Sequence, residues 1–490
     1  MKKKLIFMLF CGFMSTSICA SDIYIGASTV DITPGLPVAL MGQFHLRIAK
    51  ETNTPLSANV IVIESKEQMG IDTVVFVSCD LVYIPSQILA LVRKKVSKLM
   101  PGFSVDKIIL SATHTHTSPV LVDSTDRAAF LYKIPNQGVT QVSDYRDFLV
   151  TQIASGIVSA WEQRTKGSVT WGLRRASIPY NRRVVYADGE AKMYGNANDP
   201  GFRKIEGYED HDIQSLFFWN KAGDLIAMSI DVACPAQEVE GDIRVDADYW
   251  HPVREKLKES FGEQLVVAGW IGAAGDQSPH PIYRKRALKR MEDLSGVNRM
   301  EDISRRIVEA VEETYAIVKG DRHHNLTMMH RSEVIELPSR VVSVQEYLES
   351  KRISNAAAAE IARNPEKADQ LHARMTWYGD IVRRYQEQKL NPNPQYKTEI
   401  HIIRLGDVAI CTNQFELFTD YGIQIQAQSK ALQTFVIQLA GPGTYLPTRD
   451  AVRGGGYSAV CQSNAVGPDG GEILVDATLE LINSMWDDEE

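Results

Sequence analysis

The chain has 490 residues, of which 44% are hydrophobic and 23% charged, so it holds enough apolar material for a large folded core. Its 53 Lys and Arg residues are mixed with 61 Asp and Glu residues and form no basic run, which argues against a nucleic-acid-binding protein. After the amino-terminal segment, no stretch approaches about 18 consecutive apolar residues, so the sequence predicts no transmembrane helix in the mature chain.

The first twenty residues have the pattern of an export signal. Lys2, Lys3 and Lys4 form a positive region, an apolar stretch runs to Met14, and the small residue Ala20 precedes a candidate cleavage point. We therefore expect residues 1–20 to be a signal peptide and residues 21–490 to form a periplasmic or secreted domain. A lipid anchor at Cys19 is a less favoured alternative, because the residues before it fit that signal poorly.

Strand and helix patterns alternate from the start of the mature chain. Apolar, β-branched runs at 58–64 and 73–79 predict a hairpin that turns through Gln68-Met69-Gly70. A helix from Ser86 and a buried strand at 108–110 then predict a right-handed crossover.

The remaining elements continue this alternation, and no sequence repeat is visible. Expected strands lie at 169–178, 212–219, 224–234, 265–274, 399–405, 408–412 and 434–439. Expected helices lie at 145–161, 248–261, 300–318, from Glu416, and at 473–486. The segment 187–208 is rich in Gly, Asn and Asp and predicts a surface loop, whereas the charged, alanine-rich segment 345–388 predicts a helical excursion. The pattern favours one large α/β domain with a mixed β-sheet, flanking helices and a helical excursion near 343–390.

Two histidines, His114 and His116, directly follow the strand at 108–110. Residues i and i+2 of an extended backbone point to the same side, so both imidazoles can converge on one metal ion. Two solvated histidines on a surface loop are the simpler interpretation. The motif alone does not decide between them.

Other candidate ligands follow later strands, but spacing does not bring them together. Cys234 can be a core thiol, Glu416 a first-turn helix acid, and Tyr445 and Tyr457 loop aromatics. The four cysteines that remain after the signal segment contain no C-x-x-C pair, so no disulfide pattern can be inferred.

Several short segments of the sequence resemble the neutral/alkaline, non-lysosomal ceramidases, and they occur in that family's order. They are Val77–Asp80, Ala112–Pro119, Asn181–Arg182, Gly275–Pro279, Gln414–Phe418, Thr444–Thr448 and Tyr457. Members of this family are zinc-dependent amidases that split ceramide into sphingosine and a fatty acid, and their catalytic domain is α/β.

The resemblance implies a zinc site and a substrate carbonyl site. The implied zinc ligands are His114, Glu416, Tyr445 and, where the family has a second histidine, Cys234. The residues implied to surround the carbonyl are His116 as proton shuttle, with Arg182 and Tyr457. Asp80 is expected to position a histidine from behind. Zinc-bound water would attack the amide carbon.

Two departures from the family concern the substrate. Family members that act on ceramide commonly continue into a C-terminal β-sandwich, which this sequence does not reach, and the segment 345–388 is unlike the family. We expect an exported zinc hydrolase that cleaves an N-acyl linkage, such as that of ceramide, in a small-molecule or lipid-like acyl substrate. The alternatives are a zinc esterase or deacylase acting on a glycan or small acyl compound, and a non-catalytic binding protein that has lost the metal.

Overall fold

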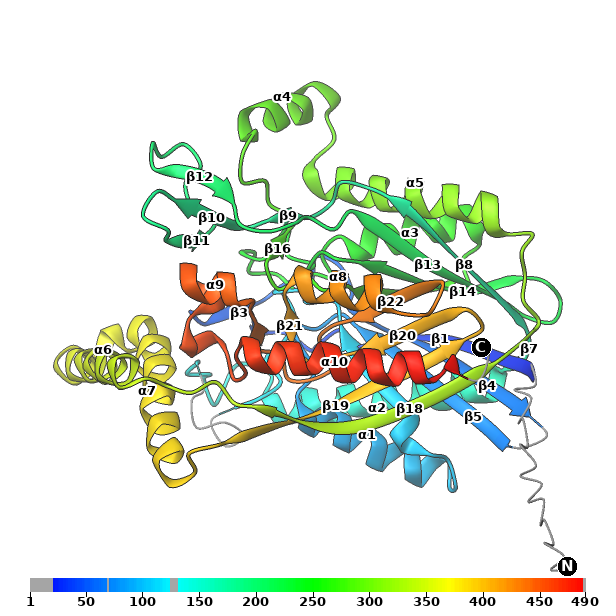
Figure 1. Cartoon of the computed structure of the whole chain (residues 1–490), viewed down its shortest axis with the longest axis horizontal. Coiled ribbons are helices and arrows are strands. Elements are labelled where there is room, and N and C mark those ends of the chain that lie inside the picture. The colour runs from blue at the N-terminus through cyan, green and yellow to red at the C-terminus, as the bar shows by residue number, and fades with distance from the viewer. Residues whose placement is uncertain (1–20, 68–69, 124–130, 488–490) are drawn as a thin grey trace, which may run out of the picture.

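The computed structural model describes residues 21–67, 70–123 and 131–487 (Figure 1). The expected signal peptide and the turn residues Gln68 and Met69 lie outside this described part. The hairpin itself is confirmed, because the two strands pair in antiparallel register up to Glu67 and Gly70.

Three units of identical topology build the protein. Unit 1 consists of β1 (Ser21–Asp31), β4 (Ser57–Glu67), β5 (Gly70–Cys79), α1 (Ser86–Leu99), β6 (Ile108–Ala112) and α2 (Val142–Gln163). Unit 2 consists of β8 (Ser168–Arg175), β13 (Asp212–Trp219), β14 (Leu225–Val232), α3 (Trp250–Phe261), β15 (Val266–Ile271) and α5 (Arg299–Val318). Unit 3 consists of β18 (Met328–Pro338), β19 (Gln395–Leu405), β20 (Val408–Thr412), α8 (Thr419–Gln428), β22 (Gln433–Ile437) and α10 (Pro468–Ser484).

In every unit, three strands pair in antiparallel fashion, and a helix then leads to a fourth strand that pairs in parallel with the third. The last helix of each unit packs over its first two strands. The short strands β7 (Thr165–Lys166) and β17 (Asn325–Leu326) extend the sheet of unit 1 beside β1. The expected α/β class with mixed sheets is therefore confirmed.

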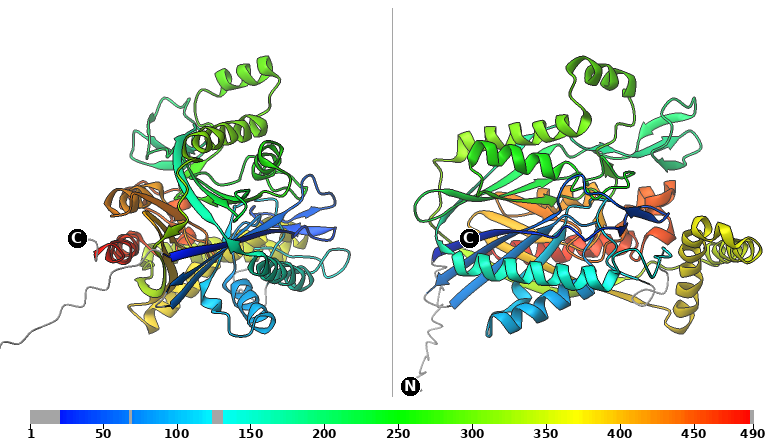
Figure 2. Two further views of the ribbon diagram at one scale, coloured as in Figure 1. Left: turned by 90° about the vertical axis from the view of Figure 1, so that its right-hand side faces the viewer. Right: turned by 180° about the vertical axis from the view of Figure 1, so that it is seen from behind.

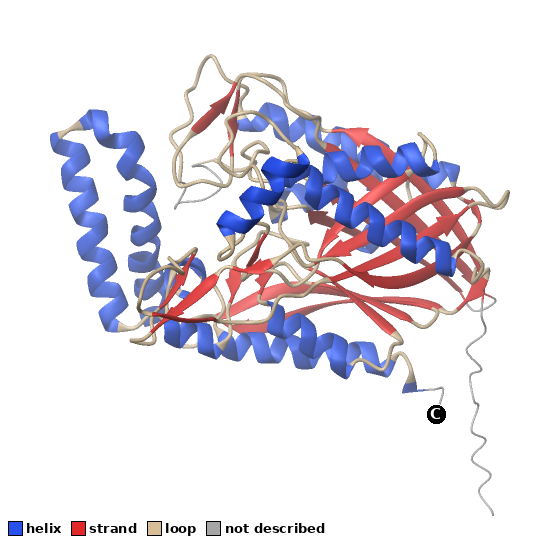
Figure 3. Ribbon diagram, turned by 90° about the horizontal axis from the view of Figure 1, so that it is seen from above, coloured by secondary structure: helices blue, strands red, loops and turns tan. Residues whose placement is uncertain are grey.

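The inner faces of the three sheets share one apolar core. One aromatic side chain from each unit meets there: Phe76 lies 5.1 Å from Trp270, which lies 6.0 Å from Phe435, measured between ring centroids. Burial of such a ring contributes about 1.5–3 kcal/mol. The outer face of each sheet packs against its own two helices in a separate apolar cluster, so the helices lie outside the sheets (Figures 2 and 3).

Three connections of each unit lie at one end of the molecule, because of the directions in which the strands run. Each antiparallel pairing reverses direction, so the first, third and fourth strands of a unit run the same way. The connections that follow them emerge at the left of Figure 1, which we call the pocket end. The first of these connections are residues 32–56 in unit 1, 176–211 in unit 2 and 339–394 in unit 3.

The connection in unit 3 is the expected helical excursion. It forms the helices α6 (Val344–Arg363) and α7 (Ala368–Leu390), which pack against each other and project from the pocket end (Figures 1 and 3). The α6 helix begins with a capping box, in which Ser343 and Glu346 satisfy each other's backbone N–H groups. In the described part of the chain, no helix is long and apolar enough to cross a membrane.

Smaller elements shape the other pocket-end connections. They are β2 (Val38–Leu40), β3 (Arg47–Ala49), β9 (Tyr180–Asn181), β16 (Gln277–Ser278), α4 (Lys285–Ser295), β21 (Glu416–Leu417), β23 (Tyr445–Leu446) and α9 (Arg449–Gly454). The sequence analysis did not single out α4, whose apolar residues Leu288, Met291 and Leu294 follow helical spacing although the helix buries none of its residues.

The segment 187–208 is not the surface loop that the sequence predicted. It carries β11 (Ala191–Met193) and β12 (Phe202–Ile205), which both pair with β10 (Arg183–Tyr186) in a small antiparallel sheet. Its glycines and polar residues form the turns between short strands, and Gly189 turns with φ +85°.

Candidate active site

A cavity of about 190 Å³ opens at the pocket end, where connections from units 1 and 3 meet. Its lining includes five of the residues that the sequence singled out: His114, His116, Glu416, Tyr445 and Tyr457. These residues lie up to 343 positions apart in the chain and are brought together only by the common direction of the strands.

His114 is held firmly in a strained backbone conformation just beyond β6. Its φ of +65° is unusual for a residue with a side chain, and strain of this kind gathers at functional sites. Its backbone N–H donates to the carbonyl of Leu81 at 2.9 Å, and Nδ1 lies 2.7 Å from the carbonyl of Val82. A carbonyl only accepts, so Nδ1 carries the proton and Nε2 presents a lone pair.

Glu416 and Tyr445 lie side by side, because β21 and β23 pair in parallel at these two residues. Glu416 Oε2 lies 3.5 Å from Nε2 of His114. Burial and the charge of Glu416 raise the pKa of Tyr445 well above its usual value. Gly275 lies so close that a Cβ there would be 2.3 Å from the carbonyl oxygen of Glu416, which explains the need for glycine.

Arg182 lies behind Tyr445 and is almost fully buried. One guanidinium nitrogen donates to the phenol oxygen of Tyr445 at 3.1 Å and to the carbonyl of Gly275 at 3.0 Å. The other donates to Oε1 of Gln237 at 3.2 Å. The cation therefore contacts the phenol directly and favours its ionised form.

His116 lies between His114 and Gln237. Its Nε2 is 2.7 Å from Nε2 of Gln237 and 3.3 Å from Nε2 of His114. The Gln237 amide oxygen accepts from Arg182, so its nitrogen must donate, and His116 Nε2 is the acceptor. Burial, followed by the neighbouring His114 and Arg47, holds the pKa of His116 well below its usual value, so the imidazole is neutral.

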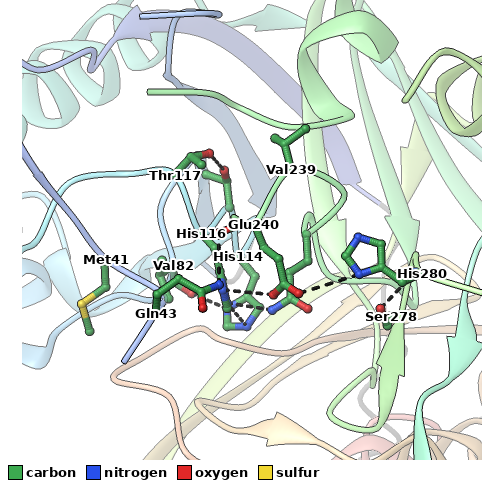
Figure 4. A network of polar contacts seen from close by, with 12 residues as sticks. Met41, Gln43, Val82, His114, His116, Thr117, Val239, Glu240, Ser278 and His280 are labelled. Atoms are coloured by element: carbon green, nitrogen blue, oxygen red, sulfur yellow. Dashed lines mark hydrogen bonds and ion pairs between the residues drawn. The ribbon is translucent and has the colours of Figure 1, made fainter. Parts of the chain in front are cut away.

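The tautomer assigned to His116 directs its Nδ1–H toward Glu240 (Figure 4). Nδ1 is buried without a hydrogen-bond partner in the described structure, and the nearest carboxylate oxygen of Glu240 lies 3.5 Å away. The other oxygen of Glu240 lies 3.7 Å from Nδ1 of His280. Glu238, which lies 3.6 Å from His280, is held by two hydrogen bonds from Arg299. A row of charged groups thus runs outward from His116.

Cys234 is not brought to this cavity. Its side chain is fully buried in the outer cluster of unit 2, and its Sγ lies 3.7 Å from the carbonyl oxygen of Pro235. Burial raises the pKa of this thiol well above its usual value. The residue that reaches His116 from this connection is Gln237, three positions later.

Asp80 supports the site in a different way from the one expected. Both of its oxygens accept from Arg254, at 2.7 and 2.9 Å, and Oδ1 also accepts from the hydroxyl of Thr113 at 3.2 Å. Asp80 therefore anchors the residue before His114, and it holds the loop rather than a histidine ring. A second buried acid, Asp276, accepts hydrogen bonds from Asn181 and Thr419 and ties the connections of units 2 and 3 together.

Sequence reasoning missed four residues at the site: Gln237, Glu240, Phe44 and Trp377. The run Gln237-Glu238-Val239-Glu240 just after a strand is a polar signal that could have been singled out. Phe44 and Trp377 lie in connections with no recognisable motif. Only the fold places them at the cavity.

The donor set was compared with that of zinc, the ion implied by the resemblance. Nε2 of His114 presents its lone pair 3.5 Å from the carboxylate of Glu416 without an intervening proton, an arrangement that a cation stabilises. In the described residues, no cluster of three or more His, Cys, Asp and Glu side chains could hold a metal, so Tyr445 is needed as a further donor. With Tyr445 as that donor, His114 and Glu416 would complete the three protein ligands that a catalytic zinc site uses, with one position left open.

Of the three comparisons with known proteins, the one with solved structures identifies the fold. No family model matches the chain, and a search of curated proteins finds no match. Among solved structures, the neutral ceramidase from Pseudomonas aeruginosa matches with a TM-score of 0.67 and 14% identity, over 95% of this chain and 74% of that one. A ceramidase complexed with C2 matches with a TM-score of 0.65 and 13% identity, over 95% and 75%. The chain therefore has the fold of the neutral ceramidases.

Proposed function

We propose that the protein is a zinc-dependent hydrolase that cleaves an N-acyl linkage in a small-molecule or lipid-like acyl substrate. The main support is the convergence of His114, Glu416 and Tyr445 at one cavity of a ceramidase-like fold. A buried lone pair 3.5 Å from a partly buried carboxylate is unfavourable without a cation, which supports a metal ion at this cluster.

In this proposal, zinc is held by His114, Glu416 and Tyr445. When bound, it supplies a Lewis acid and lowers the pKa of water toward about 7. Arg182 keeps the phenol of Tyr445 in place and favours its ionised form through the 3.1 Å hydrogen bond. Cys234 has no part in this set.

The chain's own residues orient the substrate and move its protons. Nε2 of neutral His116 exchanges its hydrogen bond from Gln237 for one from the attacking water, accepts the proton of that water and returns it to the leaving amine. Tyr457 lines the cavity beside Tyr445, with 5.6 Å between their rings, and donates its hydroxyl to the carbonyl oxygen as charge develops there. Glu240 keeps the Nδ1 side of His116 protonated.

The decisive experiment is an assay of fatty-acid release by the purified protein from N-acyl sphingosine and other N-acyl compounds. Release is expected in wild type, and it should stop on treatment with a zinc chelator and return when zinc is added. A His114→Ala variant with an unchanged circular dichroism spectrum should be inactive. Failure of wild type, loaded with one equivalent of zinc, to cleave any N-acyl compound would contradict the proposal.

We also propose that the protein is exported, on the basis of the pattern in residues 1–20. The test is amino-terminal sequencing of the protein recovered from periplasm and medium. The expected first residue is Ser21; protein that stays inside the cell with its first twenty residues intact would contradict export.

A further inference from the structure

The α6–α7 hairpin supplies part of the cavity wall. It is the first pocket-end connection of unit 3, and it places Trp377 and Asp380 of α7 in the lining beside His116 and Tyr457. The corresponding connection of unit 1 places Phe44 there. Segments from two units therefore close the cavity from outside the catalytic cluster.

Three aromatic rings form one continuous wall of this cavity. Trp377 lies 5.3 Å from Phe44 and 5.9 Å from Tyr457, and Phe44 lies 5.5 Å from Tyr457, between ring centroids. Both contacts of Phe44 are edge-on, a favourable geometry for aromatic pairs. Phe44 remains 40% exposed, so this wall lies at the mouth of the cavity and presents an apolar surface to a ligand.

The cavity is too small for a whole two-chain lipid. Its volume of about 190 Å³ is only slightly larger than the roughly 150 Å³ of an engineered apolar cavity that holds one benzene molecule, so it has room for about six carbon atoms. The rest of a larger substrate must therefore lie outside it.

A much larger cleft of about 1190 Å³ adjoins the cavity and shares Tyr83, Asp380 and Gly443 with it. The hairpin side of this cleft is charged: Arg383 forms ion pairs with Asp380 and Glu387. Arg340 and Arg384 also line it, and Arg384 donates to the carbonyls of Cys461 and Arg340. A long alkyl chain placed in this cleft would desolvate these charges without compensation.

We propose that Trp377 is a specificity-determining residue and that the substrate is an N-acyl compound with a short acyl chain and a hydrophilic amine half. The acyl chain packs against Trp377, Phe44 and Tyr457, and the amine half lies in the charged cleft beside α7. This inference rests on the proposed N-acyl hydrolysis and names its substrate class.

The test compares variants on two substrate series. The first series keeps one hydrophilic amine, glycine, and varies the acyl chain from two to sixteen carbons; the second keeps a hexanoyl chain and exchanges glycine for sphingosine. Wild type should show its highest kcat/KM near six carbons and prefer the glycine conjugate at least tenfold. Trp377→Ala should lower kcat/KM for the hexanoyl conjugate about tenfold and move the optimum to longer chains, whereas Trp377→Phe should keep the wild-type optimum.

Tyr385→Ala is the matched control, because Tyr385 is another aromatic residue of α7, stacks on Tyr347 of α6 and does not line the cavity. It should leave the chain-length profile unchanged. The inference is overturned if Trp377→Ala and wild type share one profile, if Tyr385→Ala shifts the profile equally, or if sphingosine is the preferred amine.

A binding measurement separates failure of this inference from failure of the proposed function. Calorimetry with hexanoate and palmitate probes the acyl site without any reaction. Wild type should bind hexanoate, and Trp377→Ala should weaken that binding about tenfold even if no amide is ever cleaved. Absence of hexanoate binding by wild type, or equal binding by both proteins, overturns the inference independently of catalysis.

Discussion

Units 1 and 3 differ from unit 2 in what they place just beyond their strands. His114 lies two residues past the end of β6 and reaches the cavity, and Glu416 lies four residues past the end of β20 and does the same. Cys234 lies two residues past β14, at a matching distance from its strand, yet it points into the outer core of unit 2. A similar distance from a strand end therefore does not place a side chain at the cavity.

The alternation of β14 explains the difference. Met228, Ile230 and Val232 all face the outer apolar cluster beneath α3 and α5, and Cys234 joins the same cluster. A candidate ligand that follows a strand in the sequence can therefore still point into the outer apolar cluster instead of toward the cavity. The backbone must travel further, to Gln237, before a side chain reaches His116.

The largest expected effect on activity distinguishes the proposed zinc ligands of units 1 and 3 from Cys234 of unit 2. His114→Ala and Glu416→Ala should each reduce kcat by roughly a thousandfold or more, because each removes a proposed metal donor. Cys234→Ala should keep kcat within about twofold, as should Cys411→Ala, a matched change of a buried cysteine in unit 3. Loss of activity in Cys234→Ala alone, with the fold intact, would mean that unit 2 supplies a donor after all.

Removal of Gln237 should have the next largest effect. Gln237→Ala leaves Arg182 and His116 without their shared partner, and we expect a loss of about a hundredfold in kcat, the size seen when a supporting contact of a catalytic or metal-binding residue is lost. Gln237→Glu should not rescue it, because a carboxylate cannot donate to Nε2 of His116. Steady-state kinetics decide this, and full rescue by glutamate would contradict the assigned tautomer.

Glu240 should matter less than Gln237, because it lies 3.5 Å from His116 rather than at hydrogen-bond distance. Glu240→Gln should lower kcat about tenfold and leave KM nearly unchanged, since Glu240 does not line the cavity. Glu240→Asp should recover part of the loss. A change confined to KM would show that Glu240 contacts substrate instead.

The smallest effect on activity is expected for changes to two histidines that lie where unit 1 packs against unit 3. His330 and His401 are buried there, 3.0 Å apart, with Asp72, Lys107 and Glu399 around them. Burial lowers the pKa of His330 to about 4 and that of His401 well below its usual value. In the unfolded chain, the two histidines bind protons near pH 6.5, whereas the buried pair stays neutral until the pH is much lower. The free energy of unfolding should therefore fall as the pH drops from about 6.5 to about 4.

Urea unfolding at a series of pH values measures this loss, which we expect to be on the order of 2–3 kcal/mol. The double variant His330→Gln with His401→Gln should show a shallower decline, whereas His324→Gln, at an exposed position, should follow wild type. Equal slopes for the double variant and wild type would place the titrating groups elsewhere.

Local patterns in the sequence predicted most of the helices and strands, but not how the three units are arranged. Helix α5 begins with a capping box at Asn298 and carries a buried stripe, so periodicity finds it within a residue. The repetition of one topology in three units could not be recognised in the sequence. Each unit requires only alternating apolar residues and a crossover helix, a pattern that many unrelated sequences satisfy.

For the candidate site, the sequence indicates which residue types could take part, but it does not specify in which direction each side chain points. His114, Glu416 and Tyr445 were named from the resemblance to the ceramidases, and the structure brings them to one cavity. The direction of Cys234 depends on the parity of a strand, and Trp377 depends on how a hairpin folds back, neither of which a motif specifies.

Zinc content is the most direct test of the proposed centre. Protein purified without chelators is analysed by mass spectrometry of the metal, for wild type, Cys234→Ala and Glu416→Ala. We predict one equivalent of zinc in wild type and in Cys234→Ala, and less than about a tenth in Glu416→Ala. Zinc that is lost with Cys234 and kept without Glu416 would contradict a centre built by units 1 and 3.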